Sequence, residues 1–244
     1  MGYWCTLHLF DEKKFYQEGI SMLKGETGNL SEVCFNFLKN HLVGGFSNLS
    51  IHEINLIVEQ KKQRIINISS SLDNTFLISS ELNNIKDNEN RNFFLNNLDG
   101  YYDFCKFFEY FVFNYYSDFF PHLILGKGGA LRNFDLKVKS ISYEIISKLD
   151  YWNEFLCGFD SGITNWLSNE DVNLIYLDME NLNPIENNSS EGFQSIIKIA
   201  KNKELGLIIG VNMIEQILER LPNNKLINDS IWLEKNSNGL VYEQ

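Results

Sequence analysis

Nine carboxylates lie between residues 149 and 197, and the same stretch contains no Lys, Arg or His. Two close pairs, Glu170 with Asp171 and Asp178 with Glu180, have the side chains needed for general acid–base catalysis or for binding Mg²⁺. Either chemistry also needs a cleft and one carboxyl with a raised pKa, and the sequence shows neither. Because acidic side chains are mostly exposed in folded proteins, a solvated helix face is the favoured interpretation of any single pair.

The charge of the whole segment indicates a different use, since residues 149–197 contribute −9 to a formal net charge of −11. A surface of one sign speeds the encounter with a partner of opposite sign, and aromatic side chains ringed by charge are common anchors of tight interfaces. Chance clustering of acids is the alternative. We predict a face that binds a basic protein, formed by Asp160, Trp166, Glu170, Asp171, Tyr176, Asp178, Glu180, Glu186 and Glu191.

Three other patterns could carry chemistry, and each is incomplete. Cys5 and His8 have the spacing of two zinc ligands, but no second ligand pair follows, and on a strand they would point to opposite faces. The sequence GKGG at 126–129 lacks the first Gly and the Ser or Thr of a phosphate-binding loop, and the segment before it is predicted to be helical. Cys34 and His41 lie two helical turns apart, about 11 Å, which is too far for a catalytic contact. We therefore predict no metal, no cofactor and no catalytic residue.

The composition narrows the choice of partner and compartment. An acidic chain is repelled by phosphate groups, so we expect neither direct nucleic-acid binding nor binding to anionic membranes. No apolar run reaches the roughly 18 residues of a membrane span, and the first residues lack the basic start of a signal peptide. The four cysteines are scattered, which favours a reduced, cytoplasmic protein over a disulfide framework.

Helices and strands must position all of these residues, and the spacing of apolar residues predicts most of these helices and strands. The clearest helix begins at Leu30 and ends near Gly44, and Ser50-x-x-Glu53 has the form of a capping box that starts another helix. Further helices are predicted over 11–24, 101–120, 138–156 and 212–221 and after Ser168 and Ser189. Strands are predicted over 3–10 and 205–211, with a closing hairpin over 230–243.

This order of elements predicts an α+β fold that is mainly helical, with a small sheet formed by N-terminal and C-terminal strands. The loop-rich residues 67–100 offer one possible internal boundary. The chain is otherwise expected to form a single globular domain over residues 1–244.

These features favour a binding protein over an enzyme. A small, acidic, cytosolic protein without catalytic motifs is similar in profile to the immunity proteins of bacterial toxin systems, so we predict an immunity-type inhibitor that forms a stoichiometric complex with a basic toxin, for example a nuclease. One alternative is an enzyme whose site is assembled from dispersed carboxylates and Cys or His residues, among them Cys105 and Cys157. Another is a structural subunit of a bacterial defence complex, which a broad exposed apolar surface would favour. The oligomeric state is left open.

Overall fold

The computed structural model describes residues 5–73, 101–119, 122–125, 162–178, 191–211, 226 and 240–242. The chain divides into two compact units, one formed by Met1–Lys13 with Val112–Gln244 (unit 1) and the other by Lys14–Phe111 (unit 2). The chain therefore leaves unit 1 after Lys13 and returns to it at Val112. The single-domain arrangement stays a prediction, and most of the expected boundary near 67–100 lies outside the described residues.

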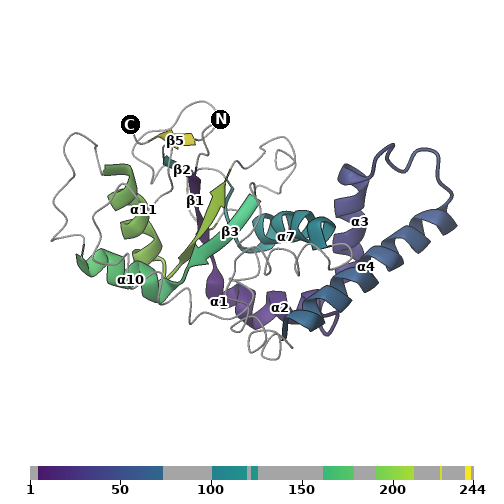
Figure 1. Ribbon diagram of the computed structural model, residues 1–244, viewed down its shortest axis with the longest axis horizontal. Helices are drawn as coiled ribbons and strands as arrows, with labels where there is room; N and C mark the ends of the chain where they lie inside the picture. The colour runs from purple at the N-terminus through teal and green to yellow at the C-terminus, as the bar shows by residue number, and fades with distance from the viewer. Residues whose placement is uncertain are drawn as a thin grey trace, which may run out of the picture. The chain divides into compact units, whose positions relative to one another are not determined.

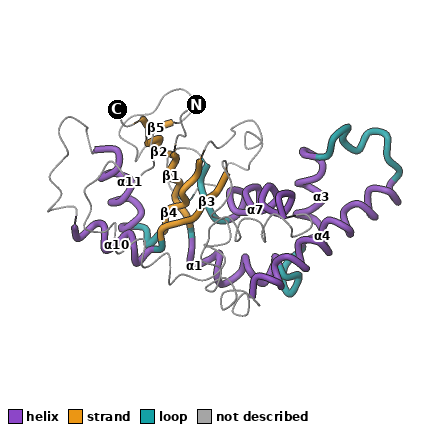
Figure 2. Tube along the Cα trace, in the orientation of Figure 1, coloured by secondary structure: helices purple, strands orange, loops and turns teal. Residues whose placement is uncertain are grey.

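Among its described residues, unit 1 contains a five-stranded sheet in the order β3-β4-β1-β2-β5, seen in Figure 2 with β1 beside β4 and β2. The strands are β1 (Cys5–Phe10), β2 (His122–Leu125), β3 (Gly162–Leu167), β4 (Gly206–Val211) and β5 (Leu240–Tyr242). Three of the four strand pairs are antiparallel, and β5 pairs parallel with β2. Strands from both ends of the chain thus share one sheet, as predicted.

One face of this sheet is covered by two helices, α10 (Asn169–Asp178) and α11 (Glu191–Asn202), which Figure 1 shows along the same side of the strands. Leu7 and Leu9 of β1 point to this face, where they pack with Leu207 of β4 and with Val172 and Ile197 of the helices. Side chains alternate along a strand, so Thr6, His8 and Phe10 point to the opposite face. All three are buried there as well.

Unit 2 is helical among its described residues. It contains the end of α1 (Glu12–Lys14), the π-helical turn η1 (Phe15–Gly19), α2 (Ile20–Leu23), α3 (Leu30–His41), α4 (Ile51–Asp73) and most of α7 (Tyr101–Tyr115). Helices α3 and α4 begin at side-chain caps. The Asn29 amide oxygen accepts from the Glu32 backbone N–H at 3.2 Å, and Ser50 and Glu53 form the predicted capping box, with the Glu53 carboxylate accepting from the Ser50 N–H at 2.7 Å.

The α+β, mainly helical prediction is confirmed. The helix predicted over 101–120 is present over Tyr101–Tyr115 as α7, and its Phe104, Phe107, Phe108 and Phe111 side chains are all buried. The prediction of a helix before residue 126 is wrong, since His122–Leu125 is strand β2. The three apolar residues of β2 are too few to show a periodicity, and pairing with β1 decides their conformation.

Other predictions of helices and strands either missed an element or fall outside the described residues. Strand β3 has no counterpart among them. The predicted helices over 138–156 and 212–221 and the GKGG loop lie outside the described residues, as does the first half of the closing hairpin. Within the described part of the chain, no helix combines the length and the apolar character needed to cross a lipid bilayer.

Candidate functional site

The described part of the acidic segment centres on α10, which begins at a buried capping box. The Ser168 backbone N–H and hydroxyl both donate to the Asp171 carboxylate at 2.8 Å, and the Asp171 N–H donates to the Ser168 hydroxyl oxygen at 3.0 Å. Burial raises the pKa of Asp171 above its usual value. The hydrogen bonds from Ser168 lower the pKa, but their effect is smaller than that of burial. Asp171 is only 1% exposed, so its carboxylate starts the helix and presents no surface to a partner.

Trp166 ends up in the core as well. Its side chain has no exposed surface, and its ring centroid lies 5.4 Å from that of Phe10 on β1. Trp166 therefore stabilises the second face of the sheet. Trp166 helps to position α10 because it anchors β3, the strand that leads into this helix. With no exposed surface, it cannot contact a partner in this conformation.

The outer face of α10 combines one acid with exposed apolar surface. Glu170 is exposed, and Asn173, Leu174 and Leu177 follow it at the i+3, i+4 and i+7 positions of the same helical stripe. Leu177 is 67% exposed, which is high for a large apolar side chain. We call these four residues the α10 stripe. The prediction from sequence omitted Leu177, although counting seven residues on from Glu170 would have found it.

Tyr176 is half-buried beside this stripe, and a lysine covers its ring. The Lys201 ammonium of α11 lies 3.9 Å from the Tyr176 ring centroid, within the range of a cation–π interaction. The acidic segment contains no base of its own, yet the fold brings one base from α11 against it. Partner contact at Tyr176 would therefore compete with Lys201.

The structure brings only part of the predicted face together. Glu170 is exposed, Tyr176 is half-buried, and Trp166 and Asp171 are buried. Asp178 and Glu191 lie on the backbones of α10 and α11, with side chains outside the description, and Asp160, Glu180 and Glu186 lie outside the described residues.

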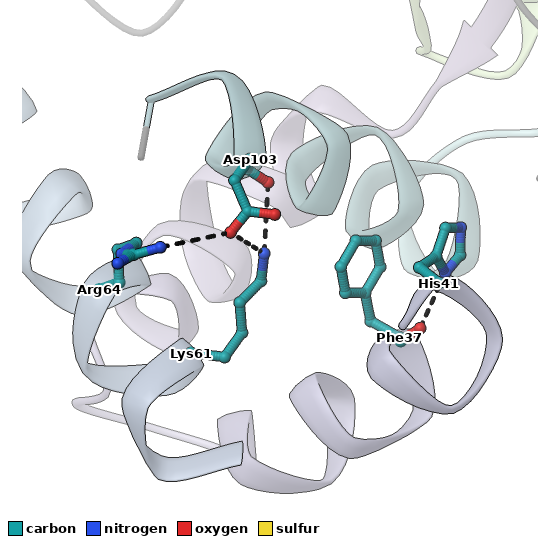
Figure 3. A network of polar contacts seen from close by, with 5 residues as sticks. All are labelled: Phe37, His41, Lys61, Arg64 and Asp103. Atoms are coloured by element: carbon teal, nitrogen blue, oxygen red, sulfur yellow. Dashed lines mark hydrogen bonds and ion pairs between the residues drawn. The ribbon is translucent and has the colours of Figure 1, made fainter. Parts of the chain in front are cut away.

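Unit 2 contains a second concentration of polar groups, around the buried Lys61 of α4 (Figure 3). The Lys61 ammonium donates to the Asp103 carboxylate of α7 at 2.5 Å and to the Asp103 backbone carbonyl at 3.4 Å. It also lies 4.7 Å from the centroid of the Phe37 ring, and Arg64 approaches the same carboxylate at 4.0 Å. Burial lowers the pKa of Lys61, and the contact with Asp103 opposes that change.

This network ties helices together and contains no activated nucleophile. Cys34 of α3 has no exposed surface, and burial raises the pKa of its thiol to about 12 despite the nearby positive charge of Lys61. The thiol is therefore protonated at neutral pH and unreactive. His41 donates to the Phe37 carbonyl at 2.8 Å and stacks on the Phe37 ring, so its side chain is held by its own helix.

We expect Cys34 to resist alkylation by iodoacetamide at neutral pH in the folded protein, because both burial and protonation protect it. Peptide mapping by mass spectrometry after a short exposure should find its peptide unmodified, and the same peptide should be fully modified in denaturant. Rapid labelling of Cys34 in the native protein would contradict the inert-thiol interpretation and reopen the enzyme alternative at this position.

A small cleft of about 130 Å³ lies at the start of α3, lined by Gly25, Thr27, Gly28, Asn29, Leu30, Ser31, Lys62 and Ile66. Its lining includes none of the carboxylates or cysteines named for the enzyme alternative. Among the residues that the structure describes, no three His, Cys, Asp or Glu side chains are grouped as metal ligands. The α10 stripe, which contains Glu170 of the predicted face, is therefore the candidate site.

Comparison with known proteins adds no assignment: no protein-family model, no curated protein and no solved structure matches this chain.

Proposed function

We propose that this chain is an acidic binding protein that captures a basic protein partner through unit 1, in the manner of an immunity protein that neutralises a toxin. The division into two units sharpens the charge argument. Unit 1 has 20 Asp and Glu against 12 Lys and Arg, whereas unit 2 has 12 against 9. The excess negative charge therefore resides mainly in the unit that contains α10.

The observation that carries the proposal is the α10 stripe. Exposing Leu177 to water is unfavourable by roughly 1.5–3 kcal/mol relative to burying it, and a partner that covers this side chain recovers that free energy. Glu170 lies two helical turns before Leu177 on the same stripe, at the rim of this surface. An apolar contact with an acid at its rim suits a partner whose own surface is basic around an apolar patch.

The two kinds of residue would act at different stages. The unbalanced acids of unit 1 would raise the rate of encounter, which falls as salt screens the charges. Leu177 would set how long the complex lasts, because desolvated apolar contacts near the centre of an interface govern dissociation. A toxin with a basic nucleic-acid site would be attracted by the acids of unit 1 and retained by the contact with Leu177.

We expect immobilised protein to retain a basic protein from a soluble extract of the source organism at low salt and to release it at high salt. Leu177→Asp should weaken the purified complex about 30-fold or more, equivalent to a hot-spot loss of about 2 kcal/mol. Glu170→Lys should chiefly slow association and flatten its dependence on salt. Surface plasmon resonance with the identified partner measures both rates.

Two matched controls come from unit 2. Glu18→Lys makes the same charge change at an exposed acid, and Val43→Asp makes a similar apolar-to-acid change at a side chain that is 99% exposed. Both should leave the complex unchanged. If the controls weaken binding as much as the α10 variants do, the contact lies elsewhere. If every protein that binds the wild type binds the Leu177→Asp variant equally well, the proposal fails.

A structural subunit is the second candidate, and one observation favours it. The hairpin of α3 and α4 exposes four large apolar side chains: Phe35, Val43, Ile51 and Leu56. If this hairpin held the chain in a larger assembly, Val43→Asp with Ile51→Asp would release it, while the α10 variants would not. The same set of variants therefore separates the two candidates.

A further inference from the structure

Two buried histidines face each other across the middle of the unit 1 sheet. His8 of β1 has no exposed surface and His122 of β2 is 2% exposed. Their ring centroids lie 4.7 Å apart. The register between β1 and β2 ends with Leu7 opposite Leu123. Extending it by one residue places His8 opposite His122, in agreement with the ring contact, so the two imidazoles lie on the sheet face away from α10 and α11.

Both rings donate to the same backbone carbonyl. His8 Nδ1–H donates to the Phe119 oxygen at 3.0 Å, and His122 Nδ1–H donates to the same oxygen at 2.7 Å. Because a carbonyl can only accept, the proton of each neutral imidazole is on Nδ1. The His8 Nε2 atom accepts from the Thr6 hydroxyl at 2.8 Å. An additional proton on either ring would therefore go to Nε2 and create a buried charge.

The surroundings oppose such a charge. Phe113 meets the His8 ring edge-on at 4.9 Å and Phe119 stacks on it at 5.0 Å. Burial and the neighbouring His122 hold the pKa of His8 well below its usual value, and burial lowers the pKa of His122 to about 4. The folded protein thus keeps both rings neutral at a pH where a hydrated histidine is already protonated.

The shared acceptor belongs to a segment that is fastened to β1 and to Asp11 by three hydrogen bonds besides the one from His8. The Asp11 N–H donates to the Tyr116 carbonyl at 2.7 Å, and the Leu9 carbonyl accepts from the Asp118 N–H at 3.2 Å and from the Ser117 hydroxyl at 2.6 Å. We call residues 116–119, fastened in this way, the clasp. The chain runs through the clasp from α7 into β2.

We propose that His8 and His122 form an acid-sensitive latch, in which proton uptake by the two rings releases the clasp from β1 and loosens β2. The sign follows from linkage. Below about pH 6.5 the open state, with hydrated rings, binds more protons than the closed state, so opening becomes more favourable as the pH falls. Between pH 7.5 and 5.5 each ring should raise the opening equilibrium about tenfold, and the two together about 100-fold.

Four other titratable residues with described side chains lie directly after β1, in the clasp or in the part of α7 that belongs to unit 1: Asp11, Tyr115, Tyr116 and Asp118. Asp118 is the nearest carboxylate in sequence to the shared acceptor, and its backbone also contacts His8. Its carboxylate accepts from the Leu226 N–H at 2.9 and 3.1 Å. The variant Asp118→Asn keeps an oxygen for Leu226 and removes the titrating group, which makes it the control for a carboxylate origin of the effect.

Amide hydrogen exchange at Asp11 and Asp118 reports opening of the clasp directly, once each rate is divided by its intrinsic rate at the same pH. In the wild type the opening equilibrium should rise about 100-fold from pH 7.5 to 5.5. His8→Asn and His122→Asn each keep a donor near the Nδ1 position and should leave about a tenfold rise. The double variant should be insensitive to pH. Asp118→Asn and the exposed His52→Asn should behave like the wild type.

A pH-insensitive wild type would overturn the latch, and so would a double variant that retains the full response or an Asp118→Asn variant that loses it. If the histidine variants do not fold, nitrogen chemical shifts of the wild-type imidazoles decide the question. Neutral Nδ1–H forms of both rings in the closed state at pH 5.5 support the latch. Protonated rings in a clasp that stays closed contradict it.

Discussion

Replacing Trp166 with alanine is expected to destabilise unit 1 by about 3–5 kcal/mol, the usual cost of removing a fully buried large aromatic side chain. Trp166 has no exposed surface and packs on Phe10, so the cavity would open beside the Phe10 ring on that face of the sheet. Urea unfolding followed by far-UV circular dichroism measures the change without relying on tryptophan fluorescence. Trp166→Phe should cost less, because it keeps an aromatic ring in the same space.

The matched control is Leu177→Ala, a truncation of a large apolar side chain on the next element of the same unit. Because Leu177 is mostly exposed, its loss should change the free energy of unfolding by no more than about 0.5 kcal/mol. The pair also separates structure from binding: Trp166→Ala should impair folding, whereas Leu177→Asp should impair only capture of the partner. A cost below about 1 kcal/mol for Trp166→Ala would contradict its place in the core.

The two partners of the Lys61–Asp103 ion pair should respond very differently to removal. Asp103→Asn leaves the Lys61 ammonium buried with no opposing charge and should destabilise unit 2 by about 2–3 kcal/mol. This is less than the 3–5 kcal/mol of a fully buried pair, since the Asp103 side chain is 48% exposed. Lys61→Met removes the buried charge and keeps an unbranched chain against Phe37, so it should change stability by no more than about 1 kcal/mol.

A double-mutant cycle in urea tests this asymmetry. Once Lys61 is methionine, Asp103→Asn should cost almost nothing further, because no buried charge is left unpaired. Lys62→Met on the same helix is the control, since Lys62 pairs with the exposed Glu59 at the surface and should contribute little. Equal costs for Lys61→Met and Asp103→Asn would show that the pair contributes as an ordinary contact.

The helices that were predicted correctly carry their signals, apolar spacing or a capping motif, within their own sequence. The spacing of Leu30, Val33, Cys34 and Phe37 marks α3, and the Ser-x-x-Glu and Ser-x-x-Asp signals mark the starts of α4 and α10. Each pattern reflects interactions between residues three or four positions apart. Such interactions are nearly complete within one turn of helix, which is why a single sequence is sufficient to predict them.

The residues of the candidate site were harder to predict, because the rotation of α10 about its own axis decides which of its side chains face water. Counting acids identifies a segment, but only the helical phase decides which of them face water. Asp171 was counted among the partner-binding acids although the Ser168-x-x-Asp171 signal already directs it back to its own helix end. Leu177 shows the converse, since an acid count ignores this exposed side chain of α10.

The sequence by itself determined the charge bias of residues 149–197, the main helices and the α+β class, because composition and short-range periodicity are local properties. Only the tertiary structure decided that β2 is a strand, that His8 meets His122, and that Lys61 pairs with an aspartate 42 residues away. Each of these depends on strand register or helix packing between distant segments. Many registers satisfy the same local patterns, and the burial of the whole core selects one of them.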